Sequence, residues 1–315
     1  MIGMNLIPGN VFQRPPQTAA SAQRAMWTAA GVLLVVLLWS YWTTLTAMAD
    51  RWARDPQYSH GFLVPVFALV VLWFRRELLK SAVWEPCLLG LPVLLAGVVI
   101  RLFAIQRDIE PLDAFALLPT LFGLVLFVGG KSVLRWSWPA LAFLIFMIPL
   151  PFFIEMSLAQ PLRRLATTMS TYLLQTCGYP AIAEGNIILI DQVKLGVADA
   201  CSGLGMLTTF IALSTALALI VQAPLTDRLV LVMSAAPIAL LANVVRIAAM
   251  GMTYQSFGSE SAQAFIHDLT GWLMMPFALL LLWLELRFLR KLLVYRPETA
   301  PSPLALPGLN MNGPG

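Results

Sequence analysis

The sequence predicts an all-α polytopic membrane protein with about eight transmembrane helices. Two observations carry this prediction. Of the 315 residues, 59% are hydrophobic and only 11% are charged, whereas a soluble protein of this length carries about 25% charged residues. The apolar residues also gather in runs long enough to cross a bilayer as helices, which takes about 20 residues.

The expected spans follow one another with short polar segments between them. They cover residues 25–48, 61–74, 87–103, 114–130, 138–154, 204–222, 229–254 and 269–288. The second run is short, but Trp73, Arg75 and Arg76 can extend it, because arginine snorkels toward the interface. The chain therefore divides into a polar tail over 1–24, a membrane domain over 25–290 and a tail over 291–315. The last tail is rich in proline and glycine and is expected to be disordered.

The basic residues indicate the orientation of the spans. If the N-terminus is cytoplasmic, twelve of the 20 lysine and arginine residues fall on the cytoplasmic side and eight on the other. Three of those eight lie within residues 155–200, a long segment that counts less in this comparison. Both termini are therefore expected inside. The net charge of +4 is an orientation signal here and does not indicate a nucleic-acid partner.

The segment 155–200, between the fifth and sixth spans, is then external. Its first half, "SLAQPLRRLATTMSTYLLQT", has apolar residues at helical spacing, which predicts an amphipathic helix on the outer membrane surface. Its second half, "NIILIDQVKLGVADA", alternates around Asp191 and Gln192 and predicts a short β-hairpin. An irregular loop is the alternative for this second half.

Three polar residues from consecutive spans are predicted to reach one depth. Cys201 lies between the external segment and the sixth span, and His267 lies just before the eighth. Arg246 lies about 27 Å up the seventh span from Arg228, near the outer edge of a ~30 Å hydrocarbon core. Asn243 precedes Arg246 by three residues and so shares its helix face. A shared depth does not establish contact, because helices can lie far apart laterally.

These residue types suit acyl transfer by a cysteine. A thiolate attacks carbonyl groups, and a neighbouring imidazolium or guanidinium lowers the thiol pKa. Histidine can protonate a leaving amine, and arginine can hold a carboxylate or stabilise an oxyanion. Gly203, two residues after Cys201, allows a peptide backbone to approach closely. With two histidines, three cysteines and no Cys-x-x-Cys pair, we expect no metal site and no cofactor.

Structural roles for the same residues stay open at this point. Cys201 can be an inert residue at a helix start, or it can form a disulfide with Cys177, which is also external. Arg246 can snorkel outward to lipid headgroups, and His267 can cap its helix at the interface.

Four motifs, in order along the chain, resemble those of the exosortase/archaeosortase family. They are "DPQYSHGFLVPVFALVVLW" at 55–73, "VADACSGLGML" from 197, "LLANVVRIAAMG" from 240 and "HDLTGW" from 267. The resemblance covers the chain from about residue 50 to 288. It implies a cysteine transpeptidase of the bacterial inner membrane, with Cys201, Arg246 and His267 as catalytic residues. Asn243, Ser202 and Gly203 match the flanking positions, and Tyr58, Ser59 and His60 match the first motif.

The resemblance also implies the partners. Exosortase substrates are secreted proteins with a C-terminal Pro-Glu-Pro signal, a hydrophobic span and a basic tail. The hydrophobic span would lie in membrane lipid beside the helices, and an unknown nucleophile or water would accept the acyl group. The active site would face the periplasm.

Two other classes of function compete with this one. A transporter or flippase of envelope polysaccharide precursors would use intramembrane charges such as Arg101 and Arg246. A non-catalytic subunit of a polysaccharide export system would need no reactive thiol.

Overall fold

The protein is described here by a computed structural model. It describes residues 17–191, 193–197, 203–221 and 224–256, together with twelve residues between 269 and 288 that occur singly or in runs of two or three. The helices of the first half are α1 (Gln17–Ser40), α2 (Trp42–Arg54), η1 (Pro56–Phe62), α3 (Leu63–Phe74), α4 (Arg76–Lys80), α5 (Gly90–Arg107), α6 (Glu110–Phe143) and η2 (Leu144–Met147). The second half contains α7 (Phe152–Thr176), strands β1 (Ala181–Glu184), β2 (Ile187–Ile190) and β3 (Val193–Gly196), and helices α8 (Leu204–Ile220) and α9 (Leu225–Ser256).

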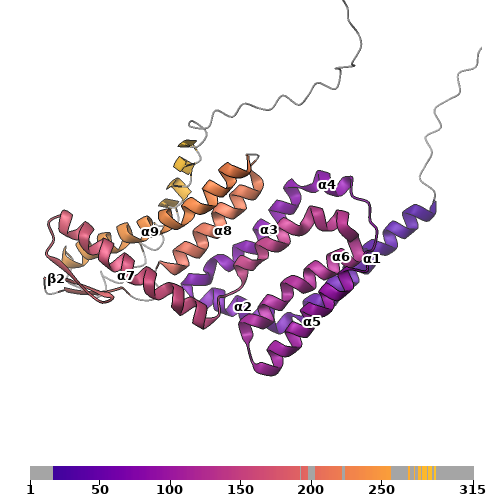
Figure 1. Cartoon of the computed structure of the whole chain (residues 1–315), viewed down its shortest axis with the longest axis horizontal. Coiled ribbons are helices and arrows are strands. Elements are labelled where there is room, and N and C mark those ends of the chain that lie inside the picture. Colours follow the sequence, from indigo (N-terminus) through magenta and orange to yellow (C-terminus); the bar gives the residue numbers. More distant parts are fainter. Residues whose placement is uncertain are drawn as a thin grey trace, which may run out of the picture.

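The described part is an all-α membrane protein apart from one small sheet (Figure 1). Among the described residues, four helices are long and apolar enough to cross a bilayer, or five if the bent pair of α1 and α2 is one span. That pair bends by 62°, and α1 already begins at Gln17, within the predicted polar tail. The 17-residue α8 is shorter but equally apolar. The count of eight spans stays a prediction.

Helix α6 reverses direction within the stretch Glu110–Met147. A straight helix of 38 residues would be about 57 Å long, nearly twice the hydrocarbon core. Gly130 instead has φ 74 and ψ −171, which no continuous helix contains. A Cβ at this position would lie 2.0 Å from the carbonyl oxygen of Glu85, so the break also needs a glycine.

The contacts on either side of Gly130 trace the outgoing and returning halves. Thr44 of α2 donates a hydrogen bond to Asp113 at the start of α6, and Trp52 of α2 donates one to the Met147 carbonyl after its end. The middle of the stretch lies at the opposite end of the bundle, where Arg75 donates to the Trp136 carbonyl. The two predicted runs 114–130 and 138–154 thus correspond to two antiparallel helical segments.

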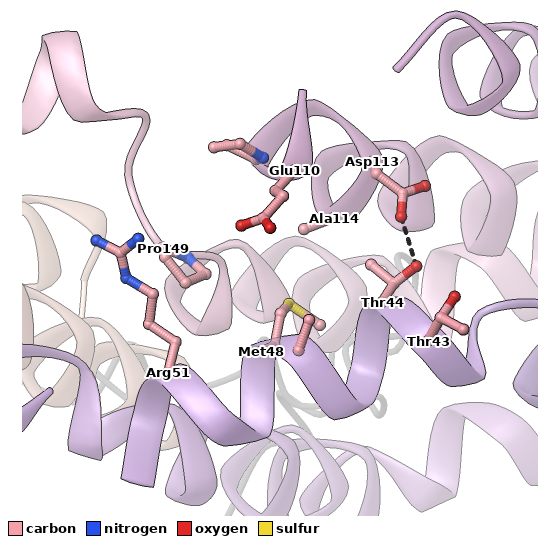
Figure 2. A pocket seen from close by; sticks show the side chains of 10 residues that line it. Thr43, Thr44, Met48, Arg51, Glu110, Asp113, Ala114 and Pro149 are labelled. Carbon is pink, nitrogen blue, oxygen red and sulfur yellow. Dashed lines mark hydrogen bonds between the residues drawn. The ribbon is translucent and has the colours of Figure 1, made fainter. Parts of the chain in front are cut away.

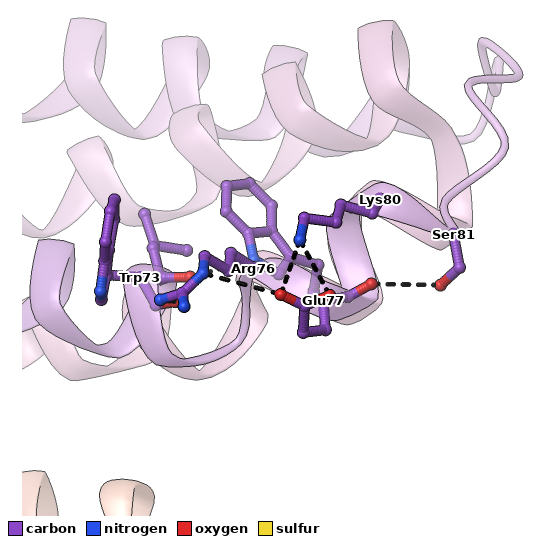
Figure 3. A network of polar contacts seen from close by, with 7 residues as sticks. Trp73, Arg76, Glu77, Lys80 and Ser81 are labelled. Carbon is purple, nitrogen blue, oxygen red and sulfur yellow. Dashed lines mark hydrogen bonds and ion pairs between the residues drawn. The ribbon is translucent and has the colours of Figure 1, made fainter.

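Figure 3 shows the polar network that follows α3 at this opposite end of the bundle. Lys80 donates hydrogen bonds of 2.8 and 3.0 Å to the carboxylate of Glu77, and Arg76 lies over the ring of Trp73. The hydrogen bond from Lys80 lowers the pKa of Glu77. Basic side chains and a tryptophan at the end of an apolar helix are typical of a membrane interface.

The prediction of a span over 138–154 is wrong at its C-terminal end. The helical stretch ends at Met147, and Ile148 and Pro151 have extended backbone. Proline disfavours helix in the residue before it, and "IPLP" contains two. Ile154 belongs to α7, which begins five residues before the amphipathic stretch that the sequence indicated.

Helix α7 runs across the ends of α8 and α9 that lie near the sheet (Figure 1). It buries one face, made of Ala159, Ala166, Thr167, Ser170, Thr171 and Leu174. The neighbouring sheet is antiparallel with strand order β1-β2-β3, and β2 and β3 join through Asp191 at φ 52. A hairpin was expected at β2 and β3, and β1 is an additional strand. Leu174, Ile188 and Ile190 are fully buried in a cluster that includes Ile247 of α9.

Candidate active site

The first motif folds into the 3₁₀ helix η1 between α2 and α3. The Asp55 carboxylate accepts a hydrogen bond of 3.0 Å from the backbone N–H of Gln57, which caps the helix, and Pro56 fixes its first residue. Tyr58 and His60 are buried, whereas Ser59 is exposed and only bonds back to the Pro56 carbonyl. Of the three predicted residues in this motif, two therefore point into the protein.

Glu155, in the first turn of α7, holds η1 in place. Its carboxylate accepts hydrogen bonds from Gln57 Nε2 and Tyr58 Oη, both at 3.1 Å, and from Arg51 at 3.3 Å. The Arg51 guanidinium also lies 5.2 Å from the ring centroid of Tyr58. Sequence reasoning missed Glu155, although a single carboxylate within "PFFIEMS" is an unusual residue in an apolar stretch.

The start of α8 lies directly on η1. A Cβ on Gly205 would lie 2.9 Å from the Cα of Gln57, so this close approach requires a glycine. One turn further along α8, the Thr209 hydroxyl lies 3.2 Å from Nδ1 of His60. The first motif and the segment after Cys201 are therefore in contact, although Thr209 and His60 are 149 residues apart in the sequence.

Helix α9 contributes two buried polar residues beside the same place. Asn243 is 0% exposed and Arg246 is 7% exposed, and their spacing of three puts both on one helix face. Gly203, the cap of α8, has φ 82, and a Cβ on it would lie 3.0 Å from Nδ2 of Asn243. The backbone at the start of α8 therefore lies against the helix face that carries Arg246.

The guanidinium of Arg246 faces inward and does not snorkel to headgroups. Its Nε is buried and finds no hydrogen-bond acceptor among the residues that the structure describes. A guanidinium with a buried N–H that is not hydrogen-bonded is suited to binding an anion.

Cys201, Ser202 and His267 lie outside the described residues, as does the tail over 291–315. Cys177 is an exposed free thiol. The Cys177–Cys201 disulfide considered from the sequence involves a residue outside the described ones and stays untested.

A second polar site lies between α2 and the start of α6 (Figure 2). It is a pocket of about 160 Å³ whose lining includes Thr43, Met48, Arg51, Glu110 and Asp113. Asp113 accepts a hydrogen bond from Thr44, which Figure 2 shows, and forms an ion pair of 3.3 Å with Arg101.

Arg101 is held by several partners at once. Besides Asp113, its guanidinium bonds the hydroxyl and carbonyl of Ser40 and lies 3.9 Å from the ring centroid of Tyr41. These contacts join α5 to α1, α2 and α6, which gives Arg101 a structural role.

Comparison with known proteins finds a family match for this chain. The family profile described as "Transmembrane exosortase (Exosortase_EpsH)" matches residues 52–284, which include η1, the start of α8 and the Arg246 face of α9. No curated protein and no solved structure matches this chain. Because the family profile covers well over half of the sequence, the chain belongs to the transmembrane exosortase family.

Proposed function

We propose that this protein is a membrane-embedded cysteine protease or transpeptidase that cleaves C-terminal sorting signals of secreted proteins. Cys201 is the nucleophile, and Arg246 and His267 assist it. The observation that carries the proposal is the contact between Gly203 and Asn243, one helical turn from Arg246.

Chain connectivity links this contact to the thiol. Cys201 precedes Gly203 by two residues, and an extended chain covers at most about 3.6 Å per residue. The Cα of Cys201 is therefore within about 7 Å of the Cα of Gly203, whose own surroundings include Asn243. An extended arginine side chain spans a comparable distance. Arg246 lies one helical turn from Asn243, so its guanidinium can reach the surroundings of Gly203, which supports a pairing of Cys201 with Arg246.

The reaction begins when the Cys201 thiolate attacks the carbonyl carbon of the scissile peptide bond. The resulting oxyanion is stabilised by the buried guanidinium of Arg246. The C–N bond then breaks, His267 gives a proton to the leaving amine, and a thioester remains on Cys201. Water or an acceptor amine attacks this thioester and regenerates the thiol.

The substrate fits a membrane geometry in which both termini of the enzyme are cytoplasmic and eight spans cross the bacterial inner membrane. The hydrophobic span of the sorting signal lies in lipid beside the enzyme, and its basic tail stays in the cytoplasm. Its Pro-Glu-Pro motif then lies at the periplasmic surface, at the depth of Cys201. The exposed apolar faces of α3 and α5 are available to lipid and to such a span.

The test is processing of a tagged secreted reporter that ends in a Pro-Glu-Pro motif, an apolar span and a basic tail. Cys201→Ala is expected to abolish processing at unchanged enzyme levels in the membrane. Arg246→Lys is expected to reduce it strongly, because an ammonium lacks the planar fork of donors. If Cys201→Ala processes the reporter at the wild-type rate, the proposal is wrong.

The transporter alternative is less well supported. It needs charged residues that are available within the membrane, but Arg101 is neutralised by Asp113 and enclosed by Ser40 and Tyr41. Of the two arginines on which that alternative rests, only Arg246 then stays available for a ligand. A non-catalytic subunit would tolerate Cys201→Ala, so the reporter assay separates that class as well.

A further inference from the structure

The outer edge of β3 is a row of backbone groups that face away from the sheet. In an antiparallel ladder, alternate residues turn their N–H and C=O groups to opposite sides. Val197 donates a hydrogen bond of 2.8 Å to the Asn186 carbonyl, and the register pairs Leu195 with Ile188. Val193, Leu195 and Val197 therefore bond toward β2, whereas Lys194 and Gly196 present their N–H and C=O groups outward.

This edge is open in the part of the chain that the structure describes. Lys194 and Gly196 are both exposed, and a Cβ on Gly196 would meet nothing within 4 Å. No described residue bonds to their outward backbone groups. Helix α9 covers the face of the sheet, where Leu195 and Val197 are buried, and leaves the edge free.

The edge of β1 at the other side of the sheet is partly occupied. The Ala181 carbonyl accepts a hydrogen bond of 2.8 Å from Gln175 of α7, and the Ala181 N–H donates to the Tyr179 carbonyl. Among the described residues, the β3 edge offers two successive outward sets of donor and acceptor, at Lys194 and Gly196, with no partner on either. Edge strands of this kind bind extended peptides by strand addition.

The β3 edge also leads to the proposed nucleophile. β3 ends at Gly196, five residues before Cys201. We propose that the substrate docks as an added strand on the outer edge of β3, with its scissile bond beyond Gly196 on the side of Cys201. This inference rests on the proposed function, because it assigns the peptide-binding part of that same site.

An acidic, proline-containing segment fits this edge. The backbone groups of successive residues in a strand face opposite sides. When the N–H of a central glutamate faces β3, the nitrogens of the prolines on either side therefore face away from β3. The exposed Lys194 supplies a positive charge beside the glutamate. A lysine on a short edge strand also discourages aggregation, and the experiments below separate that role from docking.

The first experiment blocks the edge without breaking the sheet. Gly196→Pro removes one outward N–H and leaves the bonds of Leu195 and Val197 to β2 in place. Ala183→Pro is the matched control, because Ala183 is exposed on β1 and also turns its N–H away from β2. With the sorting-signal reporter, Gly196→Pro is expected to slow processing at least tenfold, and Ala183→Pro less than twofold. Equal rates in the two variants at equal membrane levels would overturn the docking site.

The second experiment detects docking without catalysis. Gly196→Cys or Ala183→Cys is placed in a background of Cys87→Ala, Cys177→Ala and Cys201→Ala, and the reporter carries single cysteines at successive positions around its motif. Oxidation is expected to link Gly196→Cys to alternate reporter positions and to leave Ala183→Cys at background. Cross-linking no stronger than this control would overturn the proposal. Docking without processing by the wild-type enzyme would instead count against the proposed function alone.

Discussion

The side-chain nitrogen of Asn243 lies 3.0 Å from the position that a Cβ would occupy on Gly203. Gly203 also has φ 82, a left-handed conformation that costs other residues about 1–2 kcal/mol. Asn243 is fully buried, so it has little room to move. The start of α8 thus lies against α9 in a contact that glycine makes without strain or displacement of Asn243.

Gly203→Ala is therefore expected to impair processing by more than its backbone strain explains. The methyl group must push Asn243 aside and shift the segment that carries Cys201. Gly178→Ala is the matched control, because Gly178 has φ 88 and open space where a Cβ would be. Thermal unfolding and reporter processing should both show a larger loss for Gly203→Ala. Equal losses in Gly203→Ala and Gly178→Ala would mean that the contact with Asn243 contributes to neither stability nor processing.

Glu155→Ala is expected to destabilise the protein by about 1–3 kcal/mol, because it leaves the buried Tyr58 hydroxyl without its acceptor. Processing should fall together with stability, since η1 supports the start of α8. Glu155→Gln keeps one carbonyl acceptor and should retain most of the stability. The measurements are thermal unfolding in detergent and reporter turnover.

Glu184→Ala serves as the control for Glu155→Ala, because Glu184 is an exposed carboxylate on β1. It should resemble the wild type in both measurements. A Glu155→Ala protein as stable as Glu184→Ala would refute the anchoring role.

Thr209→Val should weaken processing through His60, whose Nδ1 lies 3.2 Å from the Thr209 hydroxyl. Its neighbour provides the control, since Thr208 bonds only to carbonyls of its own helix, at Leu204 and Gly205. Thr208→Val should be near the wild type. If both variants process the reporter equally well, the link between α8 and η1 through His60 is not needed.

The reversal at Gly130 predicts the sidedness of three positions. Single cysteines replace Asp108, Lys131 or Ser157 in a background free of Cys87, Cys177 and Cys201. A membrane-impermeant maleimide added to whole spheroplasts should label positions 108 and 157 and should spare position 131. Labelling of 108 and 131 from the same side would contradict two antiparallel spans within Glu110–Met147.

Much of this arrangement follows from local sequence signals. The apolar runs 114–130 and 138–154, with Lys131 and Arg135 between them, predicted two spans joined by a turn, because charge cannot stay in the bilayer centre. Asn243 and Arg246 were expected on one face from their spacing alone, and both lie there. Alternation about Asp191 indicated β2 and β3.

The features that the sequence did not predict have two causes, a local helix break inside an apolar run and tertiary contacts. The segment "IPLPFFI" is apolar throughout, so hydropathy extended the fifth span past the point where the prolines end the helix. Glu155 has no neighbouring partner in the sequence, since Gln57 and Tyr58 reach it from about 97 residues away. Four-residue β1 is too short for periodicity to distinguish it from a loop.

The central claim is that Cys201 carries the acyl group during catalysis. The most direct measurement is mass spectrometry of the wild-type enzyme, quenched with acid at short times after mixing with the sorting-signal reporter. We expect a covalent adduct on the peptide containing Cys201, with the mass of the N-terminal cleavage product and release by neutral hydroxylamine, as a thioester requires. An adduct on a different residue, together with undiminished processing by Cys201→Ala, would contradict it.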